Sequence, residues 1–128
     1  RDWSSDVCSS DLTHKRSPER TPFEPRPLII IDGTLILSQP PIRELLDWSL
    51  FIEASESVRY DRRFKRDLVE RGRQPEGIRK QFERQVKPMH DLFVEPSKLH
   101  ATEILSGETG FEAHLARWAG KIAGELEC

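Results

Sequence analysis

Arginine is concentrated near the middle of the 128-residue chain, in the stretch ESVRYDRRFKRDLVERGR at 56–73. If this stretch is helical, four of its arginines fall within an arc of roughly 100°. These four are Arg59, Arg62, Arg63 and Arg66. Two more, Arg71 and Arg73, flank Gly72, where the helix is expected to end. Because guanidinium groups pair with phosphate oxygens and offset the charge of phosphoryl transfer, the pattern indicates a clamp for a triphosphate.

Two other interpretations of this stretch stay open from the residues alone. In the first, the arginines form a solvated helix face with Arg63–Asp67 and Arg66–Glu70 as ion pairs, each worth a few tenths of a kcal/mol. Judged by itself, the stretch fits this interpretation best. In the second, the basic stripe binds RNA or DNA. No aromatic platform lies beside the stripe, however, and its acidic residues dilute the charge.

A carboxylate follows the apolar run LIII at 28–31, in the pair Asp32-Gly33. Asp-Gly between apolar runs is a strong signal for a β-hairpin, in which Asp32 would only shape the turn. The alternative is a buried parallel strand with Asp32 at its C-terminal end, where α/β sheets bind ligands. There the carboxylate could hold Mg²⁺ directly or through water. The local sequence favours the hairpin.

Strand and helix signals alternate along the rest of the chain. The predicted strands are 28–31, 48–54 and 100–105. The predicted helices begin at Pro40, behind Ser55, at Pro75 and at the capping box of Thr109 and Glu112. The stretch 87–98 is less regular. Because the apolar runs are continuous, they are typical of a parallel sheet covered on both faces, as in α/β proteins.

Composition limits the class of protein. The length fits one domain, and the residues are 33% charged and 36% hydrophobic. A net charge of −2 gives no global basic character for nucleic-acid binding. The sequence has no apolar run long enough for a membrane span and no secretory leader, so a cytoplasmic protein is expected. Cys8 and Cys128 lie at opposite ends, without the spacing of a metal site or a disulfide framework.

The first twelve residues do not resemble the rest of the chain. Residues 2–12, DWSSDVCSSDL, back-translate without a gap into the adapter DNA that is ligated to fragments for short-read sequencing. We therefore interpret 1–12 as an artefact and 13–128 as native sequence, a piece of something longer.

Three motifs are similar to the phosphoribulokinase/uridine kinase family. They are HKR…PRPLIIIDGTLIL, RRFKRDLVERGR and KQFERQVKPMHDLFVEPSKLHA, which together run from about Thr13 to Ile104. The resemblance is to the C-terminal half of uridine kinases. It implies part of a P-loop NTPase-like parallel sheet flanked by helices, with an arginine-rich lid helix. It also implies transfer of the γ-phosphate of ATP or GTP to the 5′-hydroxyl of uridine or cytidine, with Mg²⁺, by an enzyme that is a homo-oligomer when intact.

The resemblance assigns roles residue by residue. Asp32 stands where the family holds Mg²⁺ with an acidic residue, which favours the strand end over the hairpin. The residues that match the nucleoside side are His14, Arg63, Arg73 and Gln81. Arg66 and Arg71 match arginines that face the phosphates. His90 and Glu95 are expected to be structural.

The chain also departs from the family pattern. The phosphate loop G-x-x-x-x-G-K-S/T is absent, and Gly120-Lys121 lies inside a predicted amphipathic helix instead. The aspartate that would accept the hydroxyl proton is not found either. We therefore expect the chain alone to be inactive and poorly folded. A phosphoribulokinase-like small-molecule kinase and a non-catalytic nucleic-acid-binding module remain the alternatives.

Overall fold

The computed structural model describes residues 22–127, and every structural statement below concerns that part of the chain. It divides into two compact units. The described residues of the first unit are 22–31 and 124–127, and the second unit is Asp32–Ala123. All the helical and strand contacts discussed below lie within the second unit.

The second unit is built on two parallel strands, β1 (Leu50–Glu53) and β2 (Glu103–Ser106). Leu50 pairs with Glu103 and Phe51 with Ile104, so both strands end at the same edge. Phe51 and Leu105 are buried, and they point to opposite faces because they are one register position apart. The predicted parallel pairing of these two runs is confirmed.

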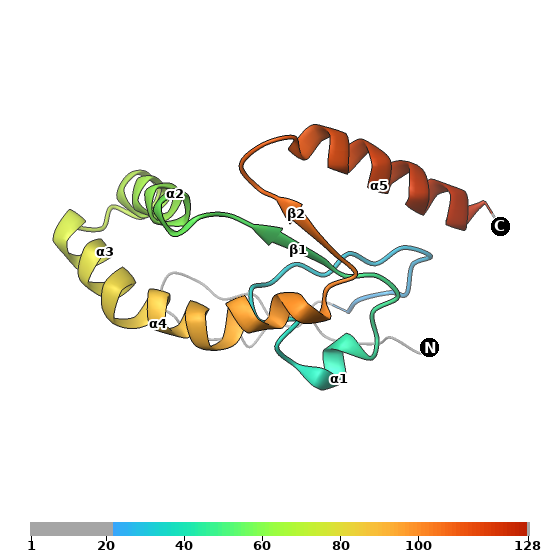
Figure 1. Ribbon diagram of the computed structural model, residues 1–128, viewed down its shortest axis with the longest axis horizontal. Helices are drawn as coiled ribbons and strands as arrows, with labels where there is room; N and C mark the ends of the chain where they lie inside the picture. The colour runs from blue at the N-terminus through green and yellow to red at the C-terminus, as the bar shows by residue number, and fades with distance from the viewer. Residues whose placement is uncertain (1–21, 128) are drawn as a thin grey trace. The chain divides into compact units, whose positions relative to one another are not determined.

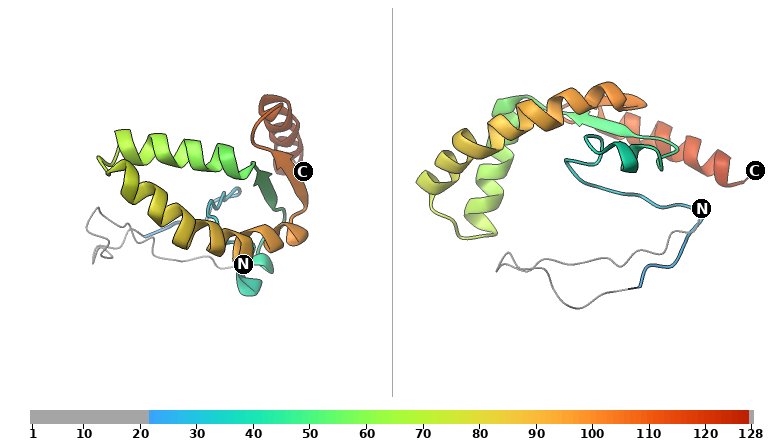
Figure 2. Two further views of the ribbon diagram at one scale, coloured as in Figure 1. Left: turned by 60° about the vertical axis from the view of Figure 1, so that its left-hand side comes forward. Right: turned by 90° about the horizontal axis from the view of Figure 1, so that it is seen from below.

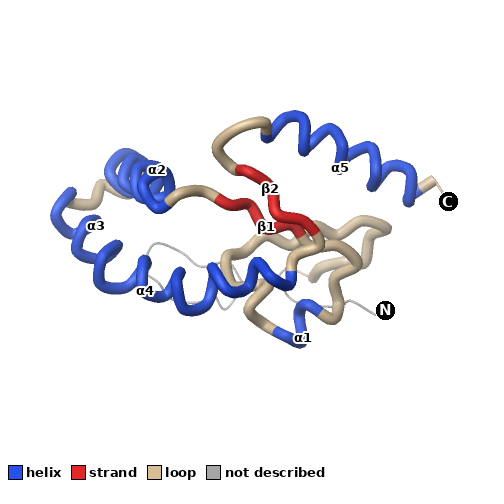
Figure 3. The backbone as a smooth tube through the Cα atoms, viewed as in Figure 1, coloured by secondary structure: helices blue, strands red, loops and turns tan. Residues whose placement is uncertain are grey.

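Helices lie on both sides of the two strands (Figures 1 and 3). On one side, α5 (Phe111–Leu126) contacts β2, where the Trp118 indole donates to a Glu103 carboxylate oxygen at 3.0 Å. On the other side lies the helical segment Glu95–His100, whose Lys98 ammonium group is 3.1 Å from a Glu53 carboxylate oxygen of β1. The expectation of an α/β arrangement with helices over both faces is therefore met around β1 and β2.

The predicted strand at 28–31 is wrong. Residues 28–33 have no regular secondary structure, and turns follow at 34–38. Ile30 is 79% exposed, and the β-hairpin does not form either. A strand exists only where a neighbour accepts its backbone hydrogen bonds, and the described residues offer this run no such neighbour. The run is followed by the short helix α1 (Pro40–Arg43), which begins at a proline as predicted.

A helical hairpin follows β1. The first arm is α2 (Glu56–Val69), and Gly72 reverses the chain with a φ of 58°. The second arm begins with α3 (Pro75–Gln81) and runs back beside α2 (Figure 2). The Tyr60 ring of α2 meets the Phe82 ring edge-on at 5.0 Å, and Ile78 is 1% exposed. These apolar contacts hold the two arms together.

The stretch at 87–98, predicted to be less regular, is helical, but π and 3₁₀ segments interrupt the α-helix there. The second arm continues through four further segments. They are the π-helix η1 (Phe82–Val86), α4 (Lys87–Met89), the π-helix η2 (His90–Val94) and the 3₁₀-helix η3 (Glu95–His100). Each π-helix is followed within two residues by a proline, Pro88 or Pro96. Proline cannot donate the usual helical hydrogen bond, so the helix continues with altered turns instead of ending.

The C-terminal helix α5 begins after Gly110, which has a φ of 66°. Thr109 bonds with Ser106 rather than forming the predicted capping box. Of the predicted apolar stripe, Trp118 is the buried member, and its ring meets Trp48 at 6.0 Å. Lys121 lies over both tryptophan rings. No helix among the described residues has the length and apolar character to cross a membrane.

Candidate functional site

The carboxylate of Asp67 gathers four arginines around it. Its side chain is 0% exposed, and it is the buried residue of α2. The distances from its oxygens are 3.0 Å to Arg66 Nη2, 3.4 Å to Arg71 Nη1, 3.5 Å to Arg63 Nε and 3.8 Å to Arg73 Nη1. We call Arg63, Arg66, Arg71 and Arg73 the arginine cluster.

Local structure explains why these arginines converge. Arg63 lies one helical turn before Asp67 on α2, so their side chains share a face. After α2, the backbone N–H of Arg73 donates to the Asp67 carbonyl at 3.0 Å. The left-handed backbone of Gly72 permits this tight reversal, which suits glycine better than any other residue. The turn thereby returns Arg71 and Arg73 to the carboxylate.

Gln81 of α3 joins the arginine cluster from the second arm of the hairpin. Its side-chain oxygen accepts hydrogen bonds from Arg73 Nη1 at 2.6 Å and from Arg63 Nη2 at 3.3 Å. Since that oxygen is engaged, the amide nitrogen of Gln81 remains as a donor.

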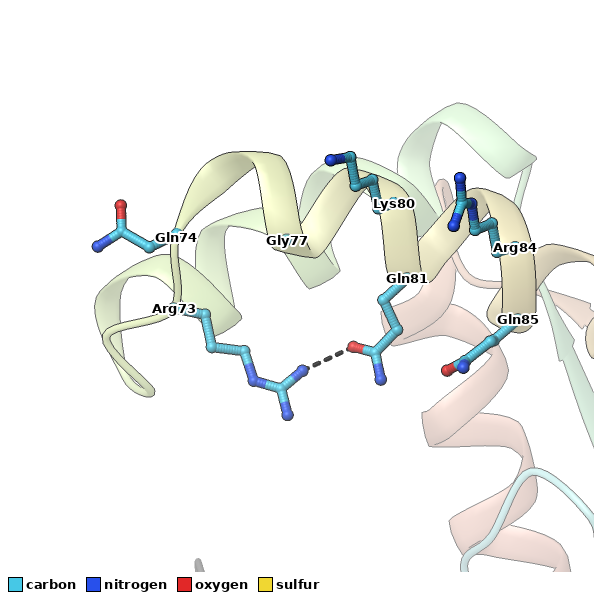
Figure 4. A pocket seen from close by; sticks show the side chains of 7 residues that line it. All are labelled: Arg73, Gln74, Gly77, Lys80, Gln81, Arg84 and Gln85. Atoms are coloured by element: carbon cyan, nitrogen blue, oxygen red, sulfur yellow. Dashed lines mark hydrogen bonds between the residues drawn. The ribbon is translucent and has the colours of Figure 1, made fainter.

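A hollow of about 470 Å³ lies against Arg73 and Gln81. Its lining is polar or cationic apart from one glycine, and consists of Arg73, Gln74, Gly77, Lys80, Gln81, Arg84 and Gln85. In Figure 4, Arg73 and Gln81 point toward one another, while the charged ends of Lys80 and Arg84 point to the other side of the helix. Arg73 of the arginine cluster thus borders an open hollow together with Gln81.

The charges of the arginine cluster control the protonation of Asp67. Burial by itself raises the pKa of the Asp67 carboxyl, but the Arg66 hydrogen bond and the charges of Arg63, Arg66 and Arg71 outweigh burial, so the pKa is lowered. For Arg63, burial lowers the pKa, the Asp67 charge raises it, and the other three arginines lower it further. The carboxylate is therefore ionised at neutral pH and offsets the repulsion among the guanidinium groups.

The arginine cluster keeps unused donors and surplus positive charge. Four guanidinium groups face one carboxylate, so three positive charges are not offset by Asp67. The side chains of Arg66 and Arg71 are 42% and 43% exposed. Each guanidinium has five N–H groups in a planar fork that matches phosphate or carboxylate oxygens. The arrangement is suited to binding a multiply charged anion.

Five of the seven residues predicted from the sequence come together here. They are Arg63, Arg66, Arg71, Arg73 and Gln81. His14 lies outside the described residues. Asp32 is exposed in the irregular stretch before the turns at 34–38, and none of the described contacts of the arginine cluster involves it.

Mg²⁺ needs few ligands from the protein itself, and an aspartate such as Asp32 has the chemistry of one. No group of three or more His, Cys, Asp or Glu side chains among residues 22–127 is arranged to hold a metal ion. Mg²⁺, however, keeps several waters and binds through one or two carboxylates together with substrate phosphates. A single exposed carboxylate at Asp32 fits that role.

Two arginines of the predicted helix face belong elsewhere. Arg59 Nε donates to the Ala54 carbonyl at 3.2 Å, and Arg62 Nη2 donates to the Gly107 carbonyl at 2.9 Å. These carbonyls follow the ends of β1 and β2, so Arg59 and Arg62 anchor α2 to the sheet edge.

The role of Asp67 is not apparent from the sequence pattern. The predicted ion pair with Arg63 places Asp67 on a solvated helix face, whereas the Asp67 side chain is 0% exposed. The Arg63–Asp67 pair is confirmed, but the described partner of Arg66 is Asp67 rather than Glu70. The available signal was spacing, because Tyr60, Phe64 and Asp67 follow one helical stripe. An acidic residue in an apolar stripe indicates a buried, paired carboxylate.

A second hollow of about 540 Å³ lies at the C-terminal ends of the strands. Five of its eleven lining residues are acidic, but described contacts already engage several of them. Lys98 pairs with Glu53 and Glu95, and Lys87 pairs with Glu56. This hollow therefore offers fewer free groups than the arginine cluster.

The part of the chain that contains the arginine cluster is similar in sequence to a known protein family. The sequence model of the Phosphoribulokinase / Uridine kinase family matches residues 10–107. The uridine kinase of Halobacterium salinarum is 42% identical over 92 residues, which cover 72% of this chain and 41% of that protein. The uridine kinase of Bacillus anthracis is 42% identical over 116 residues, covering 89% of this chain and 54% of that protein.

The uridine kinase of Chloroflexus aurantiacus is 41% identical over 95 residues, covering 74% of this chain and 46% of that protein. The chain thus spans about half the length of the curated relatives it matches. The matched region includes the whole arginine cluster and its turn. The chain belongs to the Phosphoribulokinase / Uridine kinase family.

Proposed function

We propose that the full-length protein is a uridine/cytidine kinase of pyrimidine salvage. It transfers the γ-phosphoryl group of ATP or GTP to the 5′-hydroxyl of uridine or cytidine, giving UMP or CMP. The observation that carries the proposal is the arginine cluster, in which four guanidinium groups surround one buried carboxylate beside an open hollow. Family membership and the names of the relatives support the same reaction.

In this proposal Arg66 and Arg71 are catalytic residues that face the phosphates. Phosphoryl transfer spreads negative charge over the γ-phosphoryl oxygens, and fixed guanidinium groups stabilise that charge better than water does. The helical hairpin acts as a lid over the nucleotide. Its closure excludes water and so suppresses hydrolysis of ATP.

Arg63, Arg73 and Gln81 form the nucleoside side of the site, together with His14. Arg73 and Gln81 line the hollow of about 470 Å³, which offers hydrogen-bond donors to a base or a sugar. Asp32 would hold Mg²⁺, directly or through water, and the ion would supply positive charge to neutralise the phosphates. The proposal therefore divides the site into a phosphate half and a nucleoside half that share one buried carboxylate.

The proposal requires parts that these 128 residues do not contain. The phosphate loop G-x-x-x-x-G-K-S/T does not occur in the sequence. A glycine-rich loop of this type binds phosphates through its backbone N–H groups. The full-length protein must supply that loop and the carboxylate that accepts the hydroxyl proton. Sequencing the gene upstream of the codon for Thr13 tests this requirement, because an in-frame glycine-rich loop is expected there.

The intact enzyme is proposed to be a cytoplasmic homo-oligomer that acts on a small molecule, without a nucleic-acid or membrane partner. The direct test is transfer of labelled γ-phosphate from ATP or GTP to uridine and cytidine by the full-length protein. Ribulose 5-phosphate serves as the competing substrate because the family name includes phosphoribulokinase. Transfer to uridine or cytidine is expected. Transfer to ribulose 5-phosphate alone, or RNA binding that weakens steeply with salt and no transfer, would contradict the proposal.

A further inference from the structure

Asp67 differs from every other acidic residue of α2 by its complete burial. Its side chain is 0% exposed, whereas Glu56 and Asp61 at other positions of the helix are exposed. Burying a carboxylate is unfavourable unless charges and hydrogen bonds compensate for the lost water. Here the compensation comes from the arginine cluster, so the burial of Asp67 and the arrangement of the arginines depend on each other.

The two carboxylate oxygens hold their arginines in different ways. Oδ1 accepts hydrogen bonds from Arg66 Nε at 3.1 Å and Arg66 Nη2 at 3.0 Å. Oδ2 lies 3.5 Å from Arg63 Nε and makes no hydrogen bond within the described residues. Attraction between opposite charges therefore holds Arg63 and Arg73 near Oδ2, while one nitrogen of each donates a hydrogen bond to Gln81.

Without the carboxylate, the four guanidinium groups would repel one another. The pKa of Arg63 is lowered first by burial, and the charges of the other three arginines lower it further, against the opposing effect of Asp67. Arg71 and Arg73 follow the end of α2 and are 43% and 33% exposed; Arg73 is also held by Gln81, whereas the described partner of Arg71 is Asp67. The described contact that draws all four together is Asp67.

We infer that Asp67 is a positioning residue, whose buried carboxylate assembles the arginine cluster before a polyphosphate ligand arrives. The inference rests on the proposed function for the identity of that ligand as a nucleoside triphosphate. A preassembled cluster meets the transition state without first overcoming its own repulsion, and preorganised charges of this kind contribute most to charge stabilisation. Asp67 acts through the arginines and does not touch the substrate.

The first experiment compares three forms of the full-length protein, namely wild type, Asp67→Asn and Asp61→Asn. Asparagine keeps the shape of aspartate and removes its charge. Asp61 is exposed on the same helix and contacts none of the arginine cluster, so Asp61→Asn controls for the loss of one negative charge. Phosphorylation of uridine is measured with saturating MgATP, well below the unfolding temperature of each variant.

The expected result is a fall in kcat of at least tenfold for Asp67→Asn, with less than a threefold change in the KM for ATP. Asp61→Asn is expected to keep kcat within twofold of wild type. A folded Asp67→Asn protein with wild-type kcat would overturn the inference. A purely stabilising ion pair would lower the unfolding temperature and leave kcat unchanged, so the split between kcat and stability separates the two roles.

The second experiment does not depend on kinase activity or on the folding of a variant. Arginine side-chain ¹⁵N NMR of the nucleotide-free wild-type protein reports whether guanidinium N–H groups are held in place. The inference predicts a protected Nε–H signal for Arg66 before any ligand is added. Freely exchanging and freely rotating guanidinium groups throughout the arginine cluster would overturn it. A protein that phosphorylates no nucleoside yet shows this protected signal would contradict the proposed function and leave the positioning role supported.

Discussion

Arg66 makes the closest contacts with Asp67, through two of its guanidinium nitrogens at 3.1 and 3.0 Å. Its side chain is nevertheless 42% exposed, which leaves other N–H groups directed away from the carboxylate. A guanidinium that is fixed on one edge and open on the other can bind a phosphate without losing further freedom of movement. This combination singles out Arg66 within the arginine cluster.

Replacing Arg66 with alanine in the full-length protein is expected to lower kcat for uridine phosphorylation by about 10³-fold, the effect of losing one arginine that stabilises transferring phosphate. Steady-state kinetics with saturating substrates measures it. Lys65→Ala is the matched control, because Lys65 is an exposed cation of the same helix outside the arginine cluster. Wild-type turnover in Arg66→Ala would remove Arg66 from the catalytic site.

The ionisation of Asp67 predicts how stability depends on pH. The pKa of its carboxyl in the folded protein is lowered from the ordinary value of 3.8. A carboxyl whose pKa is lowered by folding stabilises the folded state at pH values above its ordinary pKa. This stabilisation is lost as the pH falls through the folded-state pKa. Wild type should therefore exceed Asp67→Asn in free energy of unfolding by about 1–3 kcal/mol at pH 7.

The difference in free energy of unfolding between wild type and Asp67→Asn should shrink as the pH falls below 3.8, the ordinary pKa of the Asp67 carboxyl. Denaturant unfolding of both proteins between pH 7 and pH 3 measures it, with Asp61→Asn as the variant that should match wild type at each pH. A difference that stays constant over the whole range would show that the charge of Asp67 is not what stabilises the protein.

At the residue scale, five of the residues that the sequence assigns to a site lie together in the structure, but the sequence does not indicate the carboxylate at their centre. The arginines of the cluster and Gln81 were assigned by resemblance, and the contacts around Asp67 bring them together. Asp67 itself was assigned to a surface ion pair because acidic residues between arginines on a helix are usually solvated. Only the return of the chain at Gly72 shows that two further arginines close over that carboxylate.

At the scale of elements, the turn between α2 and α3 determines whether the arginine cluster exists. Gly72 has a φ of 58°, and among the described residues beyond its two chain neighbours no atom lies within 4 Å of the position that a Cβ would occupy. Substitution by alanine would therefore meet backbone strain rather than a clash. The turn places Arg71 and Arg73, so strain at this position also affects the site.

Gly72→Ala is expected to destabilise the protein by about 1–2 kcal/mol, the free-energy difference for a side chain in the left-handed region. It is also expected to lower kcat, because Arg71 and Arg73 shift away from Asp67. Chemical denaturation and steady-state kinetics of the full-length protein measure the two effects. Gly120→Ala within α5 is the control, since it should stabilise by about 0.5–1 kcal/mol and leave kcat unchanged. Equal effects of the two substitutions would contradict this account of the turn.

Element prediction succeeded where local signals agreed with the tertiary contacts. Pro40, Pro75 and Gly72 mark helix boundaries as predicted, and the apolar runs that contain β1 and β2 do form a parallel pair. The run at 28–31 carries an equally strong strand signal and has no regular structure. Strand formation depends on a neighbouring strand, and a single sequence does not state which neighbours are available.

At the scale of the whole molecule, β1 and β2 form a sheet of only two strands within residues 22–127. Ile52 is 55% exposed and Ile104 is 46% exposed, although parallel strands are normally buried on both faces. Both outer edges of this pair lack a strand partner among the described residues, and such edges favour association between chains.

Residues 13–128 produced alone are therefore expected to aggregate, to show no cooperative unfolding transition and to transfer no phosphate to uridine. Size-exclusion chromatography, thermal unfolding and the kinase assay measure the three properties, with the full-length protein as the control. A monomer that unfolds cooperatively would contradict the expectation of poor folding, and measurable turnover would contradict the need for a separate phosphate loop.

The most direct test of the account is a crystal structure of the full-length protein with uridine and a non-hydrolysable ATP analogue. The account predicts that guanidinium groups of Arg66 and Arg71 donate hydrogen bonds to oxygens of the triphosphate, while Asp67 still contacts the arginine cluster from the opposite side. A structure in which the triphosphate lies elsewhere, and the arginine cluster faces bulk solvent, would contradict it.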